Sequence, residues 1–322
     1  MAAIHHYVPR FLLKNFCAGP KPRIWAYDKS TDKSFETTVD NIAAERDFYQ
    51  AKIGSRILSM EEGLGTLETK ASIILERIIA DWSIGGLSQD DRIVIAVFAA
   101  TQMVRGPNKR EGILALDDAI RDALGERGFD RTSVEKLLPA MTADDAKAFS
   151  LLSLRDTNEF AMHVLDKSWL LFETTPDAPH YISDNPIGLQ NLVEKASPLR
   201  SNLGLAVLGI EIYLPITSTL SLVFYCRSHE EVIRNGVEMC RTNVVRDQDR
   251  TIPHFGELLK WTRAFRNGTP LDLAPENVLN QNSLQVRQAE RYVYSSIADF
   301  SLVKSMIANQ PAYRKGPRPH VV

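Results

Sequence analysis

The sequence has little cysteine and lacks the short motifs that define several classes of enzyme. Its 322 residues include three cysteines, Cys17, Cys226 and Cys240, which lie far apart and form no CxxC pair. Because three thiols cannot all pair within one chain, we expect reduced thiols in a cytoplasmic protein. The sequence also contains no GxxxxGKS/T, GxGxxG, HExxH or GxSxG motif and no zinc-finger spacing. These absences argue against a P-loop NTPase, a Rossmann enzyme, a zincin protease, an α/β-hydrolase and a zinc finger.

A large excess of charge and a long hydrophobic run are missing as well. Lys plus Arg total 38 and Asp plus Glu total 40, which gives a formal net charge of −2. This balance argues against unspecific duplex binding, and it is compatible with a phosphate-bearing ligand or single-stranded nucleic acid. The longest apolar run, residues 93–100, is too short to cross a bilayer, and the first residues lack the pattern of a secretory signal. We therefore expect a cytoplasmic protein without a membrane segment.

The composition is typical of a folded globular protein, with 44% hydrophobic and 24% charged residues. Residues 23–27 and 34–39 are strand-like on either side of a turn, which predicts an N-terminal β-hairpin. The hairpin has too little apolar material to fold alone. We therefore expect one α+β domain over residues 1–300, followed by a basic, proline-containing and partly disordered tail over 301–322.

Apolar spacing predicts a helical middle and a later sheet. The spacing favours helices over 55–82, 89–105, 110–125 and 143–166. Ser88 followed by Asp91 is typical of a helix cap. Strand-like segments follow at 169–174, 206–215 and 220–226, and then helices at 229–240, 246–266 and 276–296. Because helices and strands are segregated, we expect an α+β fold with a later antiparallel or mixed sheet and C-terminal helices.

Two adjacent histidines, His5 and His6, precede an extended Tyr7-Val8-Pro9 segment. In a strand their rings point to opposite faces, so one of them can face a site. A histidine there would serve as a proton acceptor or a metal ligand. A capping or core role is the more frequent explanation for such a pair.

Gln102 and Arg105 are three residues apart on the apolar helix and share one face. A buried arginine needs an anion, because an unpaired buried charge is very costly. Two interpretations stay open. Arg105 forms an internal salt bridge, for instance to Asp184 or Glu45, or it binds the phosphate or carboxylate of a ligand.

Three further polar positions stand out. Asp184 and Asn185 belong to a Ser-Asp-Asn-Pro segment after a strand, which is turn chemistry but also a common place for site residues. Asn282 shares a helical face with apolar residues, so it is drawn inward and needs partners; tying a loop to the core is the simpler role. Glu45 precedes the aromatic pair Phe48-Tyr49, and a solvated surface is its default.

The segment His-His-Tyr-Val-Pro-Arg-Phe-Leu-Leu-Lys-Asn-Phe at 5–16 resembles the opening of a bacterial family, domain of unknown function 4238. The similarity continues at 41–49, at Gln102 and Arg105, at 183–186 and in the helix of Asn282, and covers about residues 4–297. This resemblance implies no established reaction. The segments that resemble the family contain the same polar residues that stood out above, and we gather these residues into one candidate site. The predicted catalytic residues are His5, His6, Asp184 and Arg105, and the predicted ligand-binding residues are Glu45, Gln102, Asn185 and Asn282.

The first hypothesis is a nuclease-like hydrolase of phosphodiesters. A histidine would act as base or metal ligand, Asp184 and Glu45 would hold a divalent cation, and Arg105 would neutralise a phosphate. The His-His-x-x-Pro opening also resembles the first strand of HNH nucleases. The asparagine and second histidine of that motif do not follow at short spacing, so we do not expect a true HNH fold.

Two alternative hypotheses assign the protein to other functional classes. In one, the protein is a non-catalytic module that senses a nucleotide or a peptide, for example in bacterial defence. Hydrogen bonds from Gln102, Arg105, Asn185 and Asn282 would then read the ligand. In the other, the polar residues only pin loops around one core. The sequence leaves open whether the protein is an enzyme, whether it needs a metal, and what its oligomeric state is.

Overall fold

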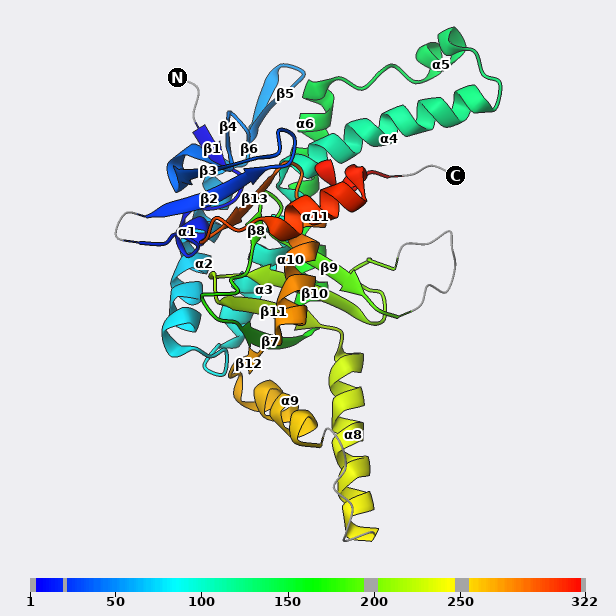
Figure 1. Ribbon diagram of the computed structural model, residues 1–322. Coiled ribbons are helices and arrows are strands. Elements are labelled where there is room, and N and C mark those ends of the chain that lie inside the picture. Colours follow the sequence, from blue (N-terminus) through cyan, green and yellow to red (C-terminus); the bar gives the residue numbers. More distant parts are fainter. Residues whose placement is uncertain (1–3, 20–21, 194–201, 247–254, 320–322) are drawn as a thin grey trace.

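The structure is a computed structural model that describes residues 4–19, 22–193, 202–246 and 255–319. It is an α+β fold, as predicted, with N-terminal antiparallel strands, a helical middle, a later mixed sheet and C-terminal helices (Figure 1). The described residues form a four-stranded sheet in the order β3-β2-β13-β8 and a five-stranded sheet in the order β12-β7-β11-β10-β9. Strands β1 with β4 and β5 with β6 form two further small ladders.

The N-terminal region begins with β1 (Ile4–His6), the short helix α1 (Arg10–Lys14) and the predicted hairpin, β2 (Arg23–Asp28) and β3 (Lys33–Thr38). A 3-10 turn and three short strands follow, β4 (Ala44–Arg46), β5 (Gln50–Ile53) and β6 (Arg56–Ser59). The hairpin gains two partners from distant parts of the chain. Strand β13 (Tyr292–Ser295) pairs with β2, and β8 (Ile182–Ser183) pairs with β13. These partners extend the hairpin into a four-stranded sheet, which supplies the further strands that a hairpin with so few apolar residues requires.

The helical middle contains α2 (Glu61–Asp81), α3 (Gln89–Val104), α4 (Pro107–Glu126), α5 (Arg131–Leu137), α6 (Ala143–Leu152) and α7 (Thr157–Leu165). Ser88 and Asp91 form a capping box at the start of α3, as their spacing predicts. The helix expected over 55–82 begins only at Glu61, because residues 56–59 pair with β5 as a strand. The helix expected over 143–166 is interrupted by a 3-10 turn at Ser153–Asp156.

The five-stranded sheet contains β7 (Ser168–Glu173), β9 (Gly188–Asn191), β10 (Ile210–Pro215), β11 (Leu220–Tyr225) and β12 (Leu271–Asp272). Its pairs are antiparallel except for the parallel pair of β12 with β7, so the sheet is mixed. Buried apolar residues of both sheets and of helices α2, α3 and α7 belong to one continuous cluster, which includes Tyr294, Leu222 and Phe98. Helix α3 therefore lies in the core, with its C-terminal end near the N-terminal strands.

The C-terminal part contains α8 (Arg227–Arg246), α9 (Phe255–Asn267), α10 (Pro275–Gln288) and α11 (Ser301–Asn309). Figure 1 shows α8 and α9 projecting together from the body, and α4 and α5 projecting at the other end. The start of the helix expected over 246–266 lies partly outside the described residues. The helix expected over 276–296 ends at Gln288, since Ala289 is extended and residues 292–295 join a sheet.

The tail expected to be partly disordered has regular structure over much of its length. It contains α11 and a 3-10 turn, Pro311–Arg314, and the Arg318 guanidinium donates to the Glu290 carboxylate. Residues 320–322 lie outside the described part. Among the described residues, no helix has the length and apolar content needed to cross a membrane.

Candidate functional site

The predicted histidines lie on strand β1, whose antiparallel partner β4 places Glu45 opposite His5. The His5 ring is buried and stacks on the Tyr49 ring, with 5.5 Å between centroids. The Tyr49 backbone N–H donates to His5 Nδ1 at 3.3 Å. Because this nitrogen must therefore carry a lone pair, the proton of a neutral His5 is on Nε2. His5 Nε2 lies 3.2 Å from a carboxylate oxygen of Glu61 but does not form a well-directed hydrogen bond with it.

His6 has the opposite arrangement. Its Nε2 lies 3.2 Å from the Val39 carbonyl oxygen, which can only accept, so Nε2 carries the proton and donates. The lone pair of a neutral His6 is then on Nδ1, for which the described residues offer no hydrogen-bond partner. Burial lowers the pKa of the half-buried His6 below its usual value and outweighs the hydrogen bond to Val39, which acts to raise it; Arg10 lowers it further. The ring is consequently neutral at pH 7, and Nδ1 can accept a proton.

Arg105 caps the C-terminal end of α3 and is buried directly behind the histidine strand. Its Nε donates to the Tyr49 hydroxyl at 2.8 Å, and its Nη2 donates to the His6 carbonyl and to the Glu68 carboxylate, each at 2.8 Å. Burial lowers the pKa of Arg105, but Tyr49 and Glu68 more than compensate and leave it raised. Arg105 thus forms an internal salt bridge, and the carboxylate is that of Glu68 rather than Asp184 or Glu45. Nη1 has no partner among the described residues.

A cleft of about 560 Å³ opens in front of the two histidines, and we call it the histidine cleft. Strand β1, helix α1, Tyr49 and one face of α2 form its walls. Its lining residues are Ile4, His5, His6, Arg10, Phe11, Lys14, Tyr49, Glu61, Leu64, Gly65, Glu68, Thr69 and Ser72. Two cations, two carboxylates and two histidines thus face a common space, which is the usual composition of a site for polar chemistry.

Asp184 is not among the residues that line the histidine cleft. Its buried carboxylate accepts the backbone N–H groups of Glu290, Arg291 and Tyr292, at 2.7, 2.7 and 2.8 Å. Burial raises the pKa of Asp184 to about 6, against the effect of these three donors. The carboxylate therefore fixes the turn between α10 and β13. The Asp184 main chain also lies close to Gly106, the residue after Arg105. A Cβ atom at position 106 would be only 3.3 Å from the Asp184 carbonyl oxygen.

The predicted amides have several different surroundings. Asn282 accepts from the Tyr181 N–H at 2.7 Å and donates to the Pro179 carbonyl at 2.9 Å, so it ties the segment before β8 to α10. Asn185 donates to the Gln288 carbonyl at 3.4 Å, and its Oδ1 has no partner among the described residues. Gln102 is fully buried, and neither its Oε1 nor its Nε2 has a partner there.

Glu45 is not on a free surface. Arg110 of α4 donates to both of its carboxylate oxygens, at 3.0 and 2.7 Å, and stacks over the Phe48 ring. The pair joins strand β4 to α4. Among the described residues, no group of three or more His, Cys, Asp or Glu side chains is placed to hold a metal ion. A divalent cation held by Glu45 and Asp184 therefore does not fit the contacts of these two carboxylates.

The structure adds Glu61, Glu68 and Tyr49 to the residues that sequence reasoning selected. The two acids are seven residues apart on α2, and together with Gly65, Thr69 and Ser72 they form one polar stripe of the helix. That stripe is a signal in the sequence, although it resembles any solvated helix face. The catalytic and ligand-binding roles assigned to His5, His6, Asp184, Arg105, Glu45, Gln102, Asn185 and Asn282 stay predictions.

These features define an α+β protein with a histidine-lined polar cleft beside a buried arginine. The family model described as Protein of unknown function (DUF4238) matches residues 4–299. The chain therefore belongs to the DUF4238 family, as its opening segment predicts. No curated protein and no solved structure matches the chain.

Proposed function

We propose that the protein is a cytoplasmic, nuclease-like hydrolase of phosphate esters and that its reaction takes place in the histidine cleft. The observation that carries this proposal is the hydrogen bond between His6 Nε2 and the Val39 carbonyl oxygen, at 3.2 Å. It leaves the Nδ1 lone pair of His6 available as a base, and the lowered pKa keeps the ring neutral at pH 7. The cysteines Cys17, Cys226 and Cys240 are free, which agrees with a reducing compartment.

The cleft contains cations that could contact a phosphate. Arg10 and Lys14 are four residues apart on α1, so both reach the same space. Arg10 has a surface partner in Asp40 at 3.0 Å, and the described residues offer Lys14 no carboxylate. On the other wall, Arg105 neutralises Glu68. Lys14 would contact and orient a phosphate group at the mouth of the cleft, with the Glu61 carboxylate of α2 acting against it.

The proposed step has one base. His6 Nδ1 accepts a proton from a water molecule while the water oxygen forms a new bond to phosphorus. The bond between phosphorus and the departing ester oxygen then breaks, and this oxygen takes the proton from His6. His5 acts as a positioning residue, since its Nδ1 accepts the Tyr49 N–H and its Nε2 lies 3.2 Å from the Glu61 carboxylate.

The test is hydrolysis of bis(4-nitrophenyl) phosphate and of a fluorescently labelled single-stranded oligonucleotide by the full chain. We expect His6→Gln to reduce kcat by about a hundredfold or more, the usual contribution of a general base. His163→Gln is the matched control, because His163 is an exposed histidine on α7. Full activity of His6→Gln would contradict the proposal.

A second candidate function, non-catalytic sensing of a nucleotide or peptide, has one observation in its favour. Gln102 and Arg105 Nη1 are buried and have no partners among the described residues, and a bound ligand would satisfy them. Binding without turnover in the same assays, with loss of binding in Gln102→Leu, would favour this function over hydrolysis.

A further inference from the structure

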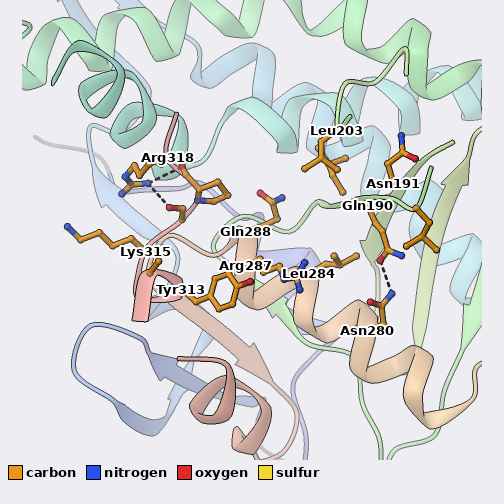
Figure 2. Close-up of a pocket in the computed structure, with 15 residues that line it drawn as sticks. Gln190, Asn191, Leu203, Asn280, Leu284, Arg287, Gln288, Tyr313, Lys315 and Arg318 are labelled. Carbon is orange, nitrogen blue, oxygen red and sulfur yellow. Dashed lines mark hydrogen bonds between the residues drawn. The ribbon is translucent and has the colours of Figure 1, made fainter. Parts of the chain in front are cut away.

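A second cavity, of about 840 Å³, lies between strand β9, helix α10 and the C-terminal residues 312–318, and Figure 2 shows it. We call it the α10 cavity. None of the residues predicted for the candidate site lines it. Its lining residues are Leu189, Gln190, Asn191, Leu192, Leu203, Asn280, Leu284, Arg287, Gln288, Ala312, Tyr313, Lys315, Gly316, Pro317 and Arg318. A volume of this size is typical of sites for small organic ligands, which range over about 300–1,000 Å³.

The lining of the α10 cavity carries three cations and no carboxylate. Arg318 is already neutralised, because it donates to both oxygens of Glu290 at 2.5 and 2.9 Å. Arg287 lies over the Tyr313 ring, 5.7 Å from its centroid, and Figure 2 shows the two side chains together. Neither Arg287 nor Lys315 has a carboxylate partner among the described residues. Two uncompensated cations therefore face one concave space, which favours an anion such as a phosphate group.

The rest of the lining would suit an organic group attached to that anion. Leucines 189, 192, 203 and 284 form an apolar wall. The Gln288 side-chain amide lines the same space and has no hydrogen-bond partner among the described residues. Gln190 is held in place, since its Oε1 accepts from Asn280 Nδ2 at 2.8 Å. An apolar wall beside amide groups can hold a planar base, because Gln and Asn amides match the donor and acceptor pattern of base edges.

We infer that the α10 cavity binds a nucleotide, with Arg287 and Lys315 on its phosphates and the leucine wall and Gln288 on its base. An acidic peptide would satisfy the two cations but would leave the leucine wall and the Gln288 amide unused. This site shares no lining residue with the histidine cleft, so the inference does not depend on the proposed hydrolysis.

The experiment is calorimetric titration of the full chain with ADP and with UDP, and in parallel with inorganic phosphate and with hexaglutamate. We expect a nucleoside diphosphate to bind more tightly than phosphate or hexaglutamate. Arg287→Gln should weaken nucleotide binding about tenfold or more, the usual effect of losing a charged hydrogen bond. Gln288→Leu should weaken nucleotide binding and leave phosphate binding unchanged. Lys304→Gln, on the exposed side of α11, is the matched control with unchanged binding.

Three results would overturn the inference: no binding of either nucleotide at millimolar concentration, tighter binding of hexaglutamate than of nucleotide, or wild-type affinity in Arg287→Gln. Because Arg287 is exposed, its substitution should leave the far-ultraviolet circular dichroism spectrum unchanged. If Arg287→Gln nevertheless unfolds, Lys315→Gln gives the same test at the second cation.

Discussion

The guanidinium of Arg105 on α3 and the carboxylate of Glu68 on α2 form a salt bridge of 2.8 Å, in which the arginine is almost completely buried and the glutamate is partly exposed. The same guanidinium donates to the Tyr49 hydroxyl and to the His6 carbonyl. One side chain thus joins two helices to the strand that carries the histidines. The position of the histidine cleft depends on this contact.

We expect Arg105→Ala to lower the free energy of unfolding by about 3 kcal/mol, because it leaves Glu68 and the His6 carbonyl without their buried partner. Urea denaturation at pH 7 measures the change. Arg10→Ala is the control, since its pair with Asp40 is exposed and should contribute about 0.5 kcal/mol or less. Equal losses in the two variants would show that the buried network does not stabilise the fold.

We expect Asp184→Asn to destabilise the protein by about 2–4 kcal/mol. The carboxylate accepts three backbone N–H groups, and an amide replaces one acceptor oxygen with a donor that opposes them. Thermal and urea denaturation measure the loss, with the exposed Asp177→Asn as the control. Wild-type stability in Asp184→Asn would mean that the turn at 290–292 holds without its anchor.

Residues close together in the sequence allowed the more reliable predictions. Ser88 and Asp91 are neighbours in the chain, so their capping box was predictable from local chemistry. The strand at 292–295 was not, because Val286, Ala289 and Val293 also follow a helical period. What makes Val293 a strand residue is its pairing with Tyr27 and Ser183, which are far away in the chain.

Prediction of the candidate site was limited in the same way, by contacts between residues that are far apart in the chain. Sequence reasoning selected His5, His6 and Arg105, and the structure brings Arg105 to the His6 carbonyl. It did not select Glu68, because an acid on an amphipathic helix is usually a solvated residue. Whether such an acid meets a buried arginine depends on how α2 packs against α3, and no local pattern in the sequence records that packing.

His180 should make stability depend on pH. Burial lowers the pKa of His180 to about 3, and neither ring nitrogen has a partner among the described residues. In the unfolded chain the ring gains its proton near pH 6.5, whereas in the folded protein it stays neutral until about pH 3. The unfolded state therefore binds more protons between these values, and stability must fall as the pH falls through this range.

We expect this histidine alone to remove about 1.4 kcal/mol of stability per pH unit below 6.5. The measurement is the difference in urea denaturation between wild type and His180→Phe at several pH values from 7 to 5. Phenylalanine fills a similar volume and cannot be protonated, so its pH profile should be flatter. Parallel profiles would show that the His180 ring is not buried as the structure has it.

The last prediction concerns the pH dependence of the proposed hydrolysis. Burial and Arg10 lower the pKa of His6, so the neutral ring persists to a pH below its usual 6.5. A base must be unprotonated to act, so kcat/KM should be level around pH 7 and fall with a slope of one as the pH drops below that lowered pKa. In Arg10→Gln the loss of a nearby positive charge should move the acidic limb to higher pH. In Lys52→Gln the limb should stay in place, because this β5 residue does not line the histidine cleft. A rate that increases as the pH falls below 6.5 would assign His6 the role of a proton donor in place of a base.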